Sequence, residues 1–208
     1  MSHFAVLVIG NNPDELLAPY DENIEEELYV RGFVTEKEKQ DFIEYYTEKN
    51  ASGDIVERTE NTLLTFEDLY EKYKEAWNEG RWKKNDEDMW VEYSTYNPLS
   101  KWDCYILGGR WPNLLKLKNQ SGSCVIGEDT KFIEGYTDSA LAEYVDLQGI
   151  GEKVHAVLYN GEWFERGEMG WWGSVHDEKD SKEWIKEVDN VIAKIPKDVL
   201  VSVYDCHI

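Results

Sequence analysis

Residues 3–9 have the sequence HFAVLVI, and every side chain from Phe4 onward is apolar. A short unbroken run of this kind, rich in β-branched residues, predicts a strand that is buried on both faces of a sheet. The turn-forming residues from Gly10 to Pro13 follow at once and end the strand. We therefore take residues 3–9 as a central strand of the fold.

Five more elements carry clear patterns. Thr65 is a good N-cap for the apolar helical stripe that follows it, and Pro196 ends a second such stripe. Asn160-Gly161 is a strong hairpin signal directly after an apolar strand, so residues 162–166 should pair back on that strand. The predicted elements are strands at 102–107, 154–159 and 199–207 and helices at 65–79 and 181–195.

Together with the first strand, this order is β-α-β-β-α-β, the pattern of ferredoxin-like folds. The broader prediction is one α+β domain over residues 1–208, with a mixed or antiparallel sheet. Two long segments would be insertions: an acidic helical one at about 11–64 and an irregular one at about 112–150. In the first insertion, Thr35 and Glu38 form a capping box before a helix at about 35–49.

The ferredoxin-like order would place strand 199–207 beside 3–9, followed by 154–159 and then 102–107, with the two middle strands parallel. Chemically active side chains would then gather at one edge of the sheet, including three of the four histidines. The segments that meet there are His3, the triplet Asp205-Cys206-His207, His155 and the turn Gly108-Gly109-Arg110.

Asp205 and His207 are two residues apart on a strand, so their side chains share a face. An Asp–His pair can bind a divalent metal or act as a general acid–base pair. The candidate catalytic residues are therefore His207, Asp205 and His155, and the candidate metal ligands are His3, Asp205 and His207.

The segment 101–118 is locally basic in a very acidic chain, and its two glycines let backbone N–H groups approach an anion closely. Arg110 offers a bidentate fork for a phosphate or a carboxylate. The candidate ligand-binding residues are Gly108, Gly109, Arg110, Trp111, Trp171 and Trp172.

Each signal also has a purely structural interpretation. His155 in an apolar strand fits a hydrogen-bonded core histidine, and Asp205 with His207 fits an ion pair at a strand end. Gly108-Gly109 fits a simple turn, and residues 170–173 fit a packed loop. No P-loop, dinucleotide-binding, zinc-protease or nucleophile-elbow motif is present in the sequence.

The formal net charge is −21, which opposes binding to nucleic acids and anionic lipids. The acidity fits either a solvated surface or mimicry of nucleic acid toward a basic partner. Three cysteines without metal-site spacing suit a reducing compartment, and no stretch is long and apolar enough to span a membrane. We therefore expect a cytoplasmic protein.

Four stretches carry a resemblance that reaches both ends of the chain: residues 2–10, Trp102-Asp103 with the GGRW motif at 108–111, the GWWG motif at 170–173 and the terminal DCHI at 205–208. They resemble uncharacterised proteins encoded by bacteriophages and prophages. The resemblance implies an accessory phage protein in the bacterial cytoplasm, and it brings no activity, fold or catalytic residue with it.

Two functions are open from the sequence. The first is a phage accessory protein that binds a host or anti-phage defence protein with a basic surface. Its acidic segment at about 14–60 would make the contact. The alternative is a nucleotide or phosphodiester-binding protein or hydrolase that uses His3, His155, Asp205, His207 and Arg110, with or without a divalent metal. A structural virion protein is a third possibility, which strong self-repulsion disfavours.

Overall fold

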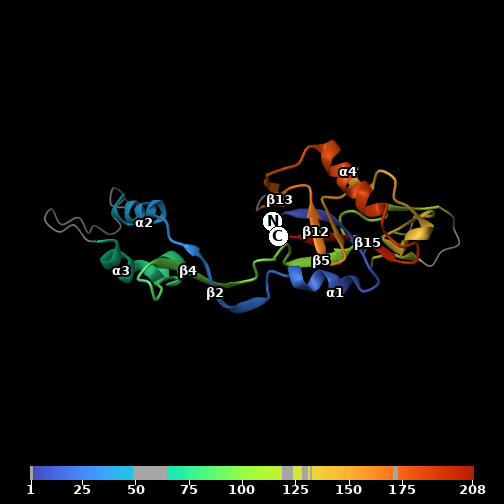
Figure 1. Ribbon diagram of the computed structural model, residues 1–208. Helices are drawn as coiled ribbons and strands as arrows, with labels where there is room; N and C mark the ends of the chain where they lie inside the picture. The colour runs from blue at the N-terminus through green and yellow to red at the C-terminus, as the bar shows by residue number, and fades with distance from the viewer. Residues whose placement is uncertain (1, 49–64, 119–123, 128–130, 132, 171–172) are drawn as a thin grey trace. The chain divides into compact units, whose positions relative to one another are not determined.

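The computed structural model describes residues 2–48, 65–118, 124–127, 131, 133–170 and 173–208 (Figure 1). It is an α+β structure that divides into two compact units. The first unit combines residues 1–24 with 97–208, and the second comprises residues 25–96. A compact unit is defined by packing, whereas a domain is defined by independent folding, so the expectation of a single domain stays a prediction.

The first unit is built on β1 (His3–Ile9), which pairs on both sides. It runs parallel to β11 (Ala156–Tyr159) and antiparallel to β15 (Leu200–His207). The sheet continues outward in the order β12-β11-β1-β15-β9-β7, and β5 also pairs with β15. The outer strands are β12 (Glu162–Glu165), β9 (Ser139–Leu141), β7 (Cys124–Val125) and β5 (Cys104–Leu107).

Both faces of β1 are buried, which confirms the prediction from its sequence. Leu7 and its neighbours on one face pack with Trp184 and Val188 of α4 (Ser181–Ile192). On the opposite face, Val6 and Val8 pack in a cluster with Leu17 of α1 (Pro13–Leu17). In Figure 1 these two helices lie on opposite sides of the sheet.

Short elements complete the first unit, and several of them lie within the segment expected to be irregular. Two small sheets pair β10-β6-β8 and β13-β14. Their strands are β6 (Leu115–Leu117), β8 (Tyr136–Thr137), β10 (Val145–Asp146), β13 (Glu168–Met169) and β14 (Val175–His176). The 3-10 helices are η1 (Ala18–Tyr20), η3 (Ala142–Tyr144) and η4 (Ile150–Glu152).

The second unit packs two helices with a three-stranded antiparallel sheet of order β2-β4-β3. Phe42 lies at the centre of its aromatic core, which includes Phe66, Tyr70 and Trp82. Both helices begin at the residues that the sequence indicates, since Thr35 and Thr65 each form a capping box. The elements are β2 (Glu25–Phe33), α2 (Glu36–Glu48), α3 (Phe66–Asn78), β3 (Trp82–Lys84) and β4 (Trp90–Tyr96).

The ferredoxin-like core is not confirmed, although two of its expected pairings are present. Strand 3–9 has the expected neighbours β11 and β15, in the expected directions. The strand expected at 102–107 is present as β5. It pairs with β15 and not with strand 154–159, beside which it was expected. The hairpin at Asn160-Gly161 folds β12 onto the free side of β11, which leaves no place for β5 there. The expected core helix 65–79 is α3, whose buried side chains belong to the second unit.

No helix among the described residues is both long enough and apolar enough to cross a membrane.

Candidate functional site

Two histidines lie side by side where β1 begins and β15 ends. His3 and His207 are direct partners in the antiparallel register, so their side chains project from the same face. Their ring centroids are 4.6 Å apart. Of the expected cluster, the structure brings together His3, Asp205 and His207 with the backbone of the Gly109-Arg110 turn.

A buried carboxylate orients His3. Its Nδ1–H donates to Oδ1 of Asp205 at 2.9 Å, and Asp205 is only 5% exposed. The other oxygen, Oδ2, accepts the backbone N–H of Arg110 at 3.0 Å. Nδ1 faces the carboxylate, so in the neutral tautomer that this contact favours, Nε2 of His3 is the acceptor or ligand atom.

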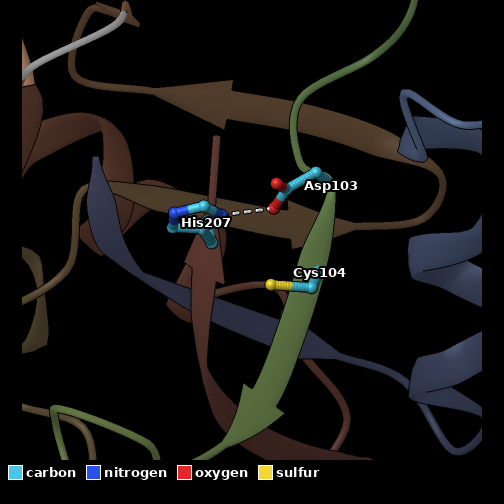
Figure 2. Close-up of side chains that lie close together, drawn as sticks. All are labelled: Asp103, Cys104 and His207. Carbon is cyan, nitrogen blue, oxygen red and sulfur yellow. Dashed lines mark hydrogen bonds and ion pairs between the residues drawn. The ribbon is translucent and has the colours of Figure 1, made fainter. Parts of the chain in front are cut away.

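A second carboxylate orients His207. Its Nδ1–H donates to Oδ1 of Asp103 at 2.6 Å, and Cys104 is its register partner on β5 (Figure 2). The backbone N–H of Asp103 donates to the carbonyl oxygen of His207 at 2.9 Å, which fixes the two segments together. The result is a pair of His–Asp dyads on three adjacent strands.

Asp103 and Cys104 affect each other's ionisation. Partial burial acts to raise the pKa of Asp103, but hydrogen bonds from His207 and Cys104 outweigh it and lower that pKa below its usual value. Cys104 is exposed as a residue, but partial desolvation of its sulfur is the first cause that raises the pKa of the thiol to about 11, followed by its hydrogen bond to Asp103 and nearby negative charges.

The Gly108-Gly109 turn packs closely against the side chain of Asp205, a carboxylate of the protein itself. Gly109 has a φ of 48°, and a Cβ placed on it would lie 2.3 Å from Cβ of Asp205. The glycine therefore allows the carboxylate to reach the N–H of Arg110. The Arg110 side chain is exposed, and Trp111 packs against the apolar core on the α4 side of the sheet.

His155 does not join the His–Asp dyads through any described contact. Its Nε2–H donates to the carbonyl oxygen of Gly167 at 2.8 Å, and its ring packs edge-on against Phe4. The pKa of His155 is lowered because burial disfavours its charged form. These contacts fit the interpretation of a satisfied core histidine.

Trp171 and Trp172 lie outside the described residues, but the glycines on either side of them are placed. The Ser2 hydroxyl donates to the carbonyl oxygen of Gly170 at 2.8 Å, and the N–H of Gly173 donates to the same hydroxyl at 2.6 Å. Gly170 and Gly173 are therefore both held by Ser2, one residue before His3.

Sequence reasoning missed Asp103 and Cys104 as members of the site. Their contribution depends on the pairing of β5 with β15, which differs from the expected strand order. The sequence places Trp102-Asp103 at the start of an apolar strand. It does not show with which other strand this one pairs, so it does not bring Asp103 and Cys104 to His207.

The cluster lies at the surface and lines none of three cavities elsewhere in the chain, whose volumes are about 370, 450 and 520 Å³. Cys104 is exposed, whereas His207 is 8% exposed. The arrangement is suited to proton transfer or metal binding at an open position, with carboxylates behind each imidazole.

Comparisons with protein-family models, with curated proteins and with solved structures give no match.

We expect Gly109→Ala to displace Asp205 and to disrupt the His3–Asp205 hydrogen bond. The matched control is Gly149→Ala, because Gly149 also has a positive φ but a Cβ placed on it would have no atom within 4 Å. The backbone strain costs about 1 kcal/mol in both variants, and overpacking adds about 1–3 kcal/mol in Gly109→Ala alone. Urea unfolding measures the difference, and equal destabilisation of the two variants would contradict the close approach.

We expect the neutral state of half-buried His155 to make stability depend on pH. Because its folded-state pKa lies below the usual value of 6.5, its contribution is complete above that pH and is lost as the pH falls toward the folded-state value. His155→Gln keeps an N–H donor for Gly167 and removes the titration. Between pH 7.5 and 5.5, the free energy of unfolding should therefore fall less in this variant than in the wild type. His176→Gln, which changes an exposed histidine, is the control and should show the same fall as the wild type.

Proposed function

We propose that the protein binds a nucleotide-like phosphate ester at the His–Asp dyads and acts on it by proton transfer. The single observation that supports this is the pair of imidazoles, each oriented at Nδ1 by its own carboxylate and separated by 4.6 Å between ring centroids. A phosphate ester needs hydrogen-bond donors for its oxygens and a proton donor for its leaving group, and two adjacent imidazoles supply both.

His3 is the proposed general acid or base. Asp205 holds it in one tautomer, and the N–H of Arg110 holds Asp205 in turn, so the dyad has a fixed direction. The exposed Arg110 side chain, carried by the same turn, is the proposed contact for the phosphate charge. A substrate that carries its own negative charge would also need this local basic group, because the chain as a whole is strongly acidic.

A panel of nucleotides and cyclic and linear phosphodiesters tests this function by thermal shift and by product analysis. We expect at least one compound to stabilise the wild type, and His3→Gln to lower turnover by about 10²–10⁴-fold, the usual contribution of a general acid or base. His176→Gln, which changes an exposed histidine, is the control. If no compound in the panel shifts the melting temperature or is converted, the proposal is wrong.

A second candidate is supported by β2 in the second unit. This strand lies at the edge of its sheet, begins with Glu25-Glu26-Glu27 and exposes Leu28, Val30 and Phe33 by 62, 48 and 65%. An edge strand with free hydrogen-bonding groups can add an extended segment of another protein. On this proposal the chain is a phage accessory protein of the bacterial cytoplasm, and its partner is a basic host or defence protein.

Retention of host proteins on the immobilised chain at increasing salt tests the second candidate. Replacing Glu25, Glu26 and Glu27 by Lys should abolish salt-sensitive retention. Replacing Glu36, Asp41 and Glu44 on α2 by Lys changes the net charge equally and should leave retention in place. Equal loss in both variants would show that only net charge matters, and no retention at low salt would reject the partner altogether.

A further inference from the structure

We propose that Asp103, Cys104 and His207 form a binding site for a zinc-like divalent transition metal. One ligand atom from each residue lies within 4.8 Å of the other two. The inference goes beyond the proposed function, because three side chains can bind a metal whether or not a phosphate ester binds beside them.

The backbone already holds the three residues in place. Cys104 and His207 are register partners in the β5–β15 ladder, so their side chains lie on one face. Asp103 precedes the strand at a bend, which allows its side chain to turn toward His207 as well (Figure 2). Its N–H donates to the carbonyl oxygen of His207, and its carbonyl oxygen accepts from Nδ2 of Asn23 at 3.2 Å.

The donor set selects the class of metal. A thiolate sulfur, an imidazole nitrogen and a carboxylate oxygen together suit Zn²⁺ and Co²⁺. Mg²⁺ and Ca²⁺ take oxygen ligands, so a site with sulfur and nitrogen donors discriminates against them. Three protein ligands leave a fourth tetrahedral position for water or for a substrate atom.

The distances fit such a metal after small side-chain movements. In a tetrahedral zinc site with bond lengths of about 2.0–2.3 Å, the ligand atoms lie about 3.5 Å from one another. The shortest separation here, 2.6 Å between Nδ1 of His207 and Oδ1 of Asp103, must open, and separations near the 4.8 Å limit must close. Changes of about 1 Å are within the reach of rotation about side-chain bonds.

The proposed set differs from the ligands expected from sequence, which were His3, Asp205 and His207. Both oxygens of Asp205 are already engaged, one by His3 and the other by the N–H of Arg110. A metal bound to one oxygen of Asp205 would compete with one of these contacts to His3 or Arg110, which lie outside the proposed set. At Asp103 it would replace side-chain hydrogen bonds from His207 and Cys104, which are the other two proposed ligands. Cys104 is exposed and Asp103 has a side chain that is 30% exposed, so a metal can enter from solvent.

The test is metal binding to the full chain, stripped with a chelator and dialysed, with no nucleotide present. After Zn²⁺ is added back and the excess is removed, we expect one Zn²⁺ per chain by elemental analysis. Co²⁺ added to the stripped chain should give a thiolate-to-metal charge-transfer band. Cys104→Ser should remove that band, and Cys104→Ser and Asp103→Asn should each weaken Zn²⁺ binding by at least the roughly 10-fold that loss of an outer-shell partner costs.

Cys206→Ala is the matched control, because Cys206 is buried and lies between Asp205 and His207 on the opposite face of β15. It should keep the cobalt band. Circular dichroism checks that Cys104→Ser is folded, which its exposed position favours. Absence of stoichiometric Zn²⁺ on the wild type, or a cobalt band that survives Cys104→Ser, overturns the proposal. His207 and Asp103 also form one of the two dyads, so phosphate-ester binding is measured separately on the metal-free chain, where its failure is distinguishable from a failure to bind Zn²⁺.

Discussion

The antiparallel pairing of β1 with β15 is the interaction on which the first unit depends. It joins residues 3–9 to residues 201–207 in continuous register, and the backbone groups of Ser2 and Ile208 extend it by two further hydrogen bonds. Every other strand of the main sheet attaches, directly or through one neighbour, to one of these two strands. The apolar clusters on both faces are organised around their side chains, so the loss of this pairing would open both clusters together.

The same pairing builds the candidate site. His3 and His207 are adjacent because they are opposite each other in this ladder, and Asp205 reaches His3 because it shares a face with His207. Asp103 and Cys104 then join from β5, on the other side of β15. The site is therefore an outcome of strand register, and a shift by one residue would turn these side chains to opposite faces.

Local signals were sufficient to predict much of this fold. The apolar run at 3–9, the hairpin at Asn160-Gly161 and the caps at Thr35 and Thr65 each depend on neighbouring residues, and each element is present. The position of β5 was predicted wrongly, because the pairing expected for strand 102–107 lies on the side of β11 that the predicted hairpin occupies. No residue of strand 102–107 indicates that its partner is β15. The sequence did not indicate that the carboxylate of Asp205 lies against the Gly108-Gly109 turn, because these residues are far apart in the chain and meet only through the pairing of β5 with β15.

The separation along the chain between the two halves of the site has a consequence for biosynthesis. His3 leaves the ribosome well before its hydrogen-bond partner Asp205, which follows 202 positions later. Until then one side of β1 lacks its strand, and an apolar strand with an open edge is prone to pair with other chains. Residues 25–96 have an apolar core of their own, made from a continuous segment, so they can pack before β15 has been synthesised. We therefore expect the nascent chain to need protection at β1 throughout this interval, and the His–Asp dyads to form only once β15 has joined the sheet.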